Sequence, residues 1–230
     1  MRYIYCHPLF DERKCAHRFS YQLSETFRKE GLELERFDYQ GTGEARGHFY
    51  TLTTESMQND LEKIISGRQV CLIGTRFGAA VAFDSCCRKI SRVINLVLIE
   101  PVISGNSYVN YLFRKQRLKD IMTGNAGELS PEDGFFNLEG YKTSNKFIEQ
   151  IRKLSLGEKS SGFNIKKYVR IAQISVSSRI NTEFALFADT LQKNNVKVSL
   201  ETFNLPSFWE RIPDTDYSVL TERIVEWCSD

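Results

Sequence analysis

The segment Gly74-Thr75-Arg76-Phe77-Gly78 has the spacing of a turn that presents a reactive side chain. An apolar run precedes it, and small and apolar residues follow it, as in a strand, a sharp turn and a helix. In the related pattern GxSxG the middle residue is a serine that attacks a carbonyl. Here the middle residue is Arg76, whose guanidinium stays protonated and has no lone pair to offer. The turn therefore has a form suited to acyl chemistry but lacks the nucleophile.

Arg76 has two possible uses, and the sequence leaves both open. Glu100 ends a neighbouring predicted strand and is the favoured partner for a structural ion pair, with Asp38 second. Alternatively, Arg76 binds a ligand. A helix N-terminus follows the turn and favours negative charge, so a carboxylate, phosphate or sulfate is expected there. One arginine can serve both purposes.

Other ionisable residues lie near the first predicted strand. His7 is a candidate acid or base, although a loop histidine hydrogen-bonded to the backbone is the favoured interpretation. Asp11 and Glu12 are expected to face solvent or to pair with Arg13 or Lys14, and not to form a catalytic carboxylate pair.

The histidines and cysteines do not have the spacing of a metal site. No CxxC pair occurs, and no histidine lies close to a cysteine pair in the sequence, so we expect no metal and no cofactor. Unpaired thiols fit a reducing cytoplasm, and most of these cysteines are expected to be small core residues. The six cysteines are Cys6, Cys15, Cys71, Cys86, Cys87 and Cys228, and the histidines are His7, His17 and His48.

Composition limits the class of partner. Thirty-one Lys and Arg residues against 29 Asp and Glu residues leave a net charge of +2, and the charges are interspersed. This pattern does not predict a nucleic-acid partner or a basic membrane patch. No apolar run reaches the ~20 residues of a membrane span, and the N-terminus lacks a signal peptide. The glycines of GTGEARG do not form a nucleotide-binding motif. A small molecule or a protein is the expected partner.

The elements that position these residues alternate between strands and helices. Apolar residues at Cys15, Phe19, Leu23 and Phe27 repeat every four residues, which predicts one face of a helix. Similar stripes predict further helices after most strands. This alternation favours an α/β fold: a mostly parallel sheet of about six strands with helices on both faces. The predicted strands span residues 2–6, 32–37, 69–73, 93–101, 168–178 and 196–203.

The alternation of predicted strands and helices stops near residue 102 and resumes near residue 168. The stretch 104–166 carries two helix-like segments, 108–122 and 145–156, around a middle part with Gly, Ser and Pro. We interpret it as a helical lid inserted into a core made of 1–103 and 167–230. Residues 124–134 are the expected site of proteolysis. The first lid helix is expected to pack one face against the core, with Tyr108, Leu112, Phe113, Ile121 and Met122 on that face.

Six ordered segments carry a resemblance to a known family. The chain resembles the α/β-hydrolase superfamily, and more narrowly the exosortase A system-associated hydrolases, type 2. That resemblance implies a bacterial setting near exopolysaccharide production. It also implies that the chain begins on the third strand of the fold, with the usual first two strands missing. The segments are PLFDERKCAHR, FDYQGTGEARG, GTRFGA, EPVISG followed by YLFRKQR, GYKTS and LPSFWE.

The resemblance implies where a catalytic triad would lie, and those positions are vacant. The acid should follow the strand that ends in ISVSSRINTEF, where Ser177, Ser178, Arg179 and Asn181 precede the first carboxylate, Glu183. The histidine should follow the last strand, where NLPSFWERIPD has no imidazole. Triad chemistry needs a base within reach of the nucleophile.

Backbone donors of the oxyanion hole depend on the fold and not on side chains. By resemblance they map onto Leu9 or Phe10, after the first strand, and onto Phe77, after the turn. The candidate ligand-binding residues are therefore Arg76, Phe77, Leu9, Phe10, Glu100 and His7.

Two functions from different classes follow. The first is a non-hydrolytic protein that binds an anionic or acyl ligand or docks a partner. The second is a hydrolase or acyltransferase for esters or thioesters with a displaced nucleophile, for which Cys6, Thr75 or a lid serine is the candidate. We favour the first.

The segment 32–37 alternates apolar and charged residues, as an edge strand does to prevent open pairing. We therefore expect a monomer, or a dimer formed through helices or the lid.

Overall fold

A six-stranded sheet forms from the segments that the sequence predicts as strands. The computed structural model describes residues 1–65, 67–88, 92–124, 133–160, 163, 168–177, 179–211 and 214–229. Every neighbouring pair in the sheet is parallel, in the order β2-β1-β3-β4-β7-β8. The predicted mostly parallel sheet is confirmed. The strands are β1 (Arg2–Cys6), β2 (Leu34–Arg36), β3 (Val70–Thr75), β4 (Val93–Ile99), β7 (Tyr168–Ile174) and β8 (Val198–Phe203).

The chain divides into two units, which we describe separately. The first contains Met1–Phe37, Glu62–Ile103 and Leu156–Asp230, and it holds the six-stranded sheet. The second contains Ser104–Ser155, from the predicted lid, together with Asp38–Leu61. Helix α3 (Thr54–Ile65) runs from the second unit into the first.

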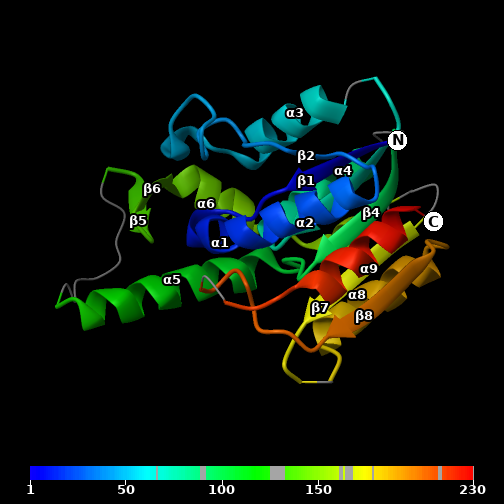
Figure 1. The fold of residues 1–230 in the computed structure, drawn as a ribbon. Coiled ribbons are helices and arrows are strands. Elements are labelled where there is room, and N and C mark those ends of the chain that lie inside the picture. Colours follow the sequence, from blue (N-terminus) through cyan, green and yellow to red (C-terminus); the bar gives the residue numbers. More distant parts are fainter. Residues whose placement is uncertain are drawn as a thin grey trace. The chain divides into compact units, whose positions relative to one another are not determined.

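Helices cover both faces of the sheet in the first unit. On one face lie α2 (His17–Lys29) and α9 (Ser218–Ser229), side by side in Figure 1. The predicted stripe of Phe19, Leu23 and Phe27 is buried there in one core cluster with residues of β1, β3, β4 and β7. On the other face, α4 (Phe77–Cys87) and α8 (Thr182–Lys193) meet where the rings of Phe83 and Phe187 lie 5.2 Å apart. The remaining helices of this unit are α1 (Phe10–Cys15) and α7 (Leu156–Lys159).

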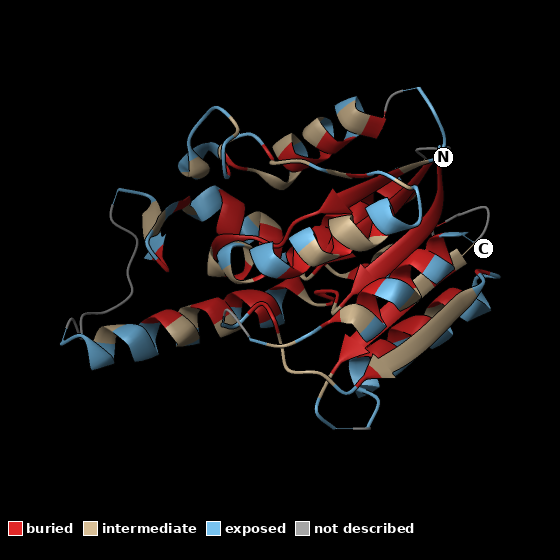
Figure 2. Cartoon of the chain, in the orientation of Figure 1, coloured by how far each residue is buried: buried red, intermediate tan, exposed pale blue. Residues whose placement is uncertain are grey.

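Burial follows the order of the strands. The central strands β3 and β4 are buried along their whole length, which explains their continuous apolar sequences. The edge strands are more open: Figure 2 shows β8 largely in the intermediate colour, and only Leu34 is buried in β2. The charged residues Glu35 and Arg36 of β2 confirm the predicted edge position, and Glu35 forms an ion pair with Arg2.

The second unit contains both predicted lid helices and a hairpin that the sequence analysis missed. Strands β5 and β6 pair antiparallel, with Leu138 opposite Tyr141. The turn between them is Glu139-Gly140, and both residues have positive φ, 54° and 88°, as a two-residue hairpin turn requires. The dipeptide Glu139-Gly140 was the feature of the sequence that could have predicted this hairpin turn. The elements are η1 (Phe49–Thr51), α5 (Gly105–Met122), β5 (Phe135–Leu138), β6 (Tyr141–Ser144) and α6 (Asn145–Arg152).

Only the first half of the predicted apolar face of α5 is buried. Tyr108 and Leu112 are buried, but Ile121 and Met122 are 57% and 86% exposed, so the expected packing of these two residues is wrong. They lie in the last turn of α5. The predicted proteolytic site falls mostly on 125–132, outside the described residues. No helix in the described part of the chain is both long and apolar enough to cross a membrane.

Candidate functional site

A sharp turn joins β3 to α4 at the carboxyl edge of the sheet. Arg76 is the residue between strand and helix, with φ 54° and ψ −121°, a conformation that side chains rarely adopt. Two glycines make the turn possible. A Cβ at Gly74 would lie 2.4 Å from Ala79 Cα, and one at Gly78 would lie 2.2 Å from the carbonyl oxygen of Cys6. The predicted strand-turn-helix is therefore present, with its tight approach to the end of β1.

Glu12 is the ion-pair partner of Arg76, which the sequence analysis did not predict. Arg76 Nε lies 3.2 Å from Glu12 Oε1. The Glu12 side chain has no exposed surface and the Arg76 side chain is 16% exposed. The predictions that Glu100 would be this partner and that Glu12 would face solvent are wrong. The short helix α1 begins at the end of β1 and turns Glu12 inward, while Asp11 pairs with Lys14 as predicted.

Glu100 lies beside Arg76 but directs its carboxylate elsewhere. Its Oε1 accepts the backbone N–H of Ile174 at 2.6 Å, and its carbonyl oxygen accepts Arg76 Nη1 at 3.4 Å. Burial raises the pKa of Glu100 to about 7. The Ile174 N–H and the Arg76 charge lower this pKa, and the Glu210 carboxylate raises it, but burial is the largest cause.

The raised pKa of Glu100 predicts a specific dependence of stability on pH. The carboxyl is protonated more readily in the folded state than in the unfolded state, where its pKa is near 4.5. Its favourable contribution is therefore fully present below pH 4.5 and is lost as the pH rises to about 7. The difference amounts to roughly 3 kcal/mol at 1.36 kcal/mol per pKa unit.

We expect Glu100→Gln to remove this pH-dependent loss of folding stability and to be more stable than the wild type above pH 7. The amide oxygen of the glutamine can still accept the hydrogen bond from the Ile174 N–H. Urea unfolding between pH 4 and pH 8 measures the effect. Glu183→Gln, at an exposed carboxylate, is the control. Identical pH profiles for the wild type and Glu100→Gln would contradict the prediction.

Trp209 covers the other side of Arg76. The Arg76 guanidinium carbon lies 5.2 Å from the centroid of the Trp209 ring, a distance at which a cation and a ring attract. The neighbouring Phe208 is fully buried and stacks on Phe19 with ring centroids 3.9 Å apart. This is the loop in which the resemblance would place a histidine. Instead its two aromatic residues pack into the core and against Arg76, a role that the sequence analysis missed.

The candidate oxyanion residues lie at the same edge. Leu9, Phe10 and Phe77 are each 1% exposed, and Phe10 has a positive φ of 54°. The close approach of Gly78 to the carbonyl oxygens of Cys6 and His7 brings the segment after β1 next to the start of α4. The backbone N–H of Arg76 donates to Ile99 in the next strand. The use of these backbone groups as anion donors remains a prediction.

The alternative nucleophile candidates, Cys6 and Thr75, are buried and not accessible to solvent. Cys6 and Thr75 have no exposed surface. The Thr75 hydroxyl is hydrogen-bonded to the hydroxyl of Tyr5 at 2.8 Å, in a setting where burial raises the pKa of Tyr5. His7 is 6% exposed and lies edge-on to Tyr5. None of these groups is presented to solvent.

The loop after β7 is organised by amides. Gln173 Oε1 accepts the backbone N–H of Asn181 at 2.7 Å, and its Nε2 donates to the carbonyl of Arg179 at 2.8 Å. Asn181 in turn caps α8 by accepting the N–H of Glu183. Ser178 lies outside the described residues. The loop in which the resemblance would place the catalytic acid is therefore fixed by hydrogen bonds to the Gln173 side chain.

Comparisons with known proteins identify the fold. No protein-family model and no curated protein matches the chain. Among solved structures, ferulic acid-bound Est1E from Butyrivibrio proteoclasticus matches with a TM-score of 0.66 and 13% identity, over 99% of this chain and 89% of that one. The hydrolase olei00960 from Oleispira antarctica matches with a TM-score of 0.66 and 12% identity, over 100% and 92%.

A third match is the mouse alpha/beta hydrolase domain-containing protein 10, with a TM-score of 0.64 and 15% identity, over 99% of this chain and 89% of that one. At these identities the likeness shows the fold alone. Taken with the parallel sheet and the strand-turn-helix at Arg76, these matches show that this chain has the α/β-hydrolase fold.

Proposed function

We propose that the protein is a non-hydrolytic binding or accessory protein built on the α/β-hydrolase fold. One observation carries this proposal: the residue at the strand-to-helix turn is Arg76, held by the buried carboxylate of Glu12. An arginine in this pair cannot attack a carbonyl. Fold alone does not establish chemistry, so the residues of the turn decide the proposal.

The surroundings of Arg76 support the same conclusion. Trp209 lies over the guanidinium, from the loop where a histidine would be required. The three histidines of the chain all precede the turn, and His7 is buried beside Tyr5. Nucleophilic catalysis requires a base within hydrogen-bond reach of the nucleophile, and among the described residues of the turn and of the loop after β8 neither a serine at position 76 nor a histidine is found.

The proposed ligand is a small anionic or acyl molecule, or a partner protein, at the carboxyl edge of the sheet. Glu100 is the side chain that could distinguish ligands, because a carboxyl with a pKa of about 7 is partly protonated at neutral pH and can then donate a hydrogen bond. An anion that reaches Arg76 must compete with Glu12, and displacing a buried carboxylate is costly. A neutral acyl oxygen therefore suits this edge better than a free anion.

We expect no serine-hydrolase activity. The wild-type protein should not react with a fluorophosphonate probe and should not turn over short acyl esters, because the residue at the turn is Arg76 and not a serine. Gel fluorescence after labelling measures the first and chromogenic ester hydrolysis the second, with an active serine esterase as positive control. Labelling, or turnover that a single substitution abolishes, would refute the proposal.

The comparisons favour a second candidate function. Several of the matched structures are described in hydrolytic terms, among them esterases, lipases and an enol-lactonase. A hydrolase or acyltransferase for esters or thioesters would then use a displaced nucleophile, with Cys6, Thr75 or a serine of 104–166 as candidates. Cys6 and Thr75 would have to become exposed first, since neither has surface in this structure. Ester turnover by the wild type that iodoacetamide abolishes, together with loss of both turnover and labelling at residue 6 in Cys6→Ala, would establish this candidate for Cys6.

The biological setting is also a proposal. It rests on the six sequence segments that resemble exosortase A system-associated hydrolases of type 2. On that basis the protein would act near bacterial exopolysaccharide production, where it would bind a precursor or a protein of that system.

A further inference from the structure

The end of α5, in the second unit, carries three exposed apolar side chains. Leu118, Ile121 and Met122 are 58%, 57% and 86% exposed, whereas the other apolar residues of α5, all of them described, are buried or half-buried. Spacings of three and four residues place the three on one face of the helix. Figure 2 shows exposed residues at this end of α5. We call these three residues the apolar tip.

Basic residues surround the apolar tip. Positions 114–122 hold four basic residues and one acidic residue, a charge of +3, whereas the whole chain carries +2. The near-neutral total hides this cluster, so the overall charge did not predict it. In the described part of the chain only Lys115 of the four forms an ion pair, with Glu139. The other three are exposed: Arg114, Arg117 and Lys119.

The cations and the apolar tip share one surface of α5. Arg114 lies four residues before Leu118, and Arg117 lies four residues before Ile121. Each of these arginines is therefore one helical turn from an apolar residue on the same face. Lys119 follows Leu118 directly and flanks that face. A helix face that packs against protein has few unpaired cations, and a solvated face has few large apolar residues. The mixture suits a partner with negative charge above an apolar layer.

We propose that the apolar tip inserts into the headgroup region of a membrane that contains anionic phospholipids. Arg114, Arg117 and Lys119 then lie against the lipid phosphates, because long basic side chains reach outward while apolar side chains lie deeper. A membrane fits the size of this patch better than a protein does. Stable protein interfaces bury about 800 Å² on each partner, whereas reversible membrane contact needs only a few inserted side chains and nearby cations. This contact is independent of the site at Arg76.

Cosedimentation of the full chain with vesicles tests the contact. One set of vesicles is phosphatidylcholine alone, and the other contains one part phosphatidylglycerol to three parts phosphatidylcholine. We expect the wild type to bind the second set, and to bind the first about tenfold more weakly or worse, because the cations gain nothing from a neutral surface.

Two double variants separate the cations from the apolar tip. Arg114→Gln/Arg117→Gln and Leu118→Gln/Ile121→Gln should each weaken binding to phosphatidylglycerol vesicles about tenfold or more. All four residues are exposed and glutamine is a good helix former, so both variants are expected to fold, which circular dichroism checks. Each variant tests the contact by itself.

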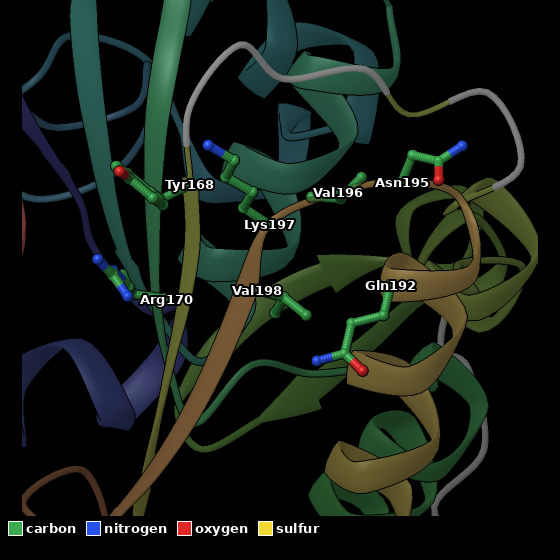
Figure 3. A pocket seen from close by; sticks show the side chains of 7 residues that line it. All are labelled: Tyr168, Arg170, Gln192, Asn195, Val196, Lys197 and Val198. Carbon is green, nitrogen blue, oxygen red and sulfur yellow. The ribbon is translucent and has the colours of Figure 1, made fainter.

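Lys193→Gln/Lys197→Gln is the matched control, since it removes the same amount of charge from the first unit. Both lysines are exposed. Lys193 pairs with Asp189 on α8, and Figure 3 shows Lys197 where the chain enters β8. We expect this control to bind vesicles as the wild type does.

Each outcome bears on the proposal. Binding that requires phosphatidylglycerol, falls in both α5 variants and is unchanged in the control supports it. Absence of vesicle binding by the wild type would overturn it, and this is the result expected if a protein is the partner. Equal losses in the control would overturn it, because they indicate general electrostatic attraction. Unchanged binding of Leu118→Gln/Ile121→Gln would overturn the insertion of the apolar tip.

Discussion

Arg76→Met is expected to destabilise the protein by about 3–5 kcal/mol, the usual result of removing one member of a buried ion pair. The Glu12 side chain has no exposed surface, so without the guanidinium its charge has neither Arg76 nor solvent to stabilise it. Methionine keeps much of the aliphatic contact with Trp209, which isolates the loss of charge. Chemical unfolding followed by circular dichroism measures the difference.

The double variant Arg76→Met/Glu12→Gln separates the ion pair from packing. Removing both charges should recover most of the lost stability, because an amide costs much less to bury than an unpaired carboxylate. Arg28→Met is the control: Arg28 pairs with Glu25 on α2, its side chain is 73% exposed, and we expect little change in stability because solvent screens the pair. Additive losses in the double variant would show that the pair contributes little.

Gly78→Ala is expected to cost at least ~3 kcal/mol and to lower the yield of folded protein. The new Cβ would lie 2.2 Å from the carbonyl oxygen of Cys6 and 2.3 Å from that of His7. Both are backbone atoms at the end of β1, so no side-chain rotation can relieve the clash and α4 must move away from the sheet. Thermal unfolding of the purified variant measures the cost.

Gly157→Ala provides the comparison for that substitution. Gly157 lies in α7, and a Cβ there would meet nothing within 4 Å. Alanine favours helices over glycine by up to ~1 kcal/mol, so this variant should be as stable as the wild type or slightly more stable. Similar behaviour of the two variants would contradict our account of the turn at Gly78.

The strands and helices of the first unit could be predicted from periodicity, because each has a regular apolar pattern. The stripe of Phe19, Leu23 and Phe27 and the continuous apolar runs of β3 and β4 fix both the element type and its buried side. The tight turn at Arg76 was also predictable, since glycines flank it at the required spacing.

The partner of Arg76 could not be predicted in the same way. Glu12 lies 64 positions earlier in the chain, and its inward direction depends on how α1 leaves β1, which no periodicity encodes. Glu100 was the nearer choice by topology, yet the N–H of Ile174 takes its carboxylate. The exposed end of α5 was missed for a related reason: an apolar stripe shows which side of a helix can pack, but not how far its partner extends.

The carboxyl edge holds three residues in costly backbone conformations. Phe10, Arg76 and Glu100 have φ values of 54°, 54° and 47°, and none is glycine. Such conformations cost of order 1–3 kcal/mol each, and they persist only where the surroundings enforce them. If the edge served only as scaffold, glycine at these positions would release that energy without loss. The chain thus holds backbone strain at this edge of the sheet, and this stored energy is itself a reason to look for a binding event at the same edge.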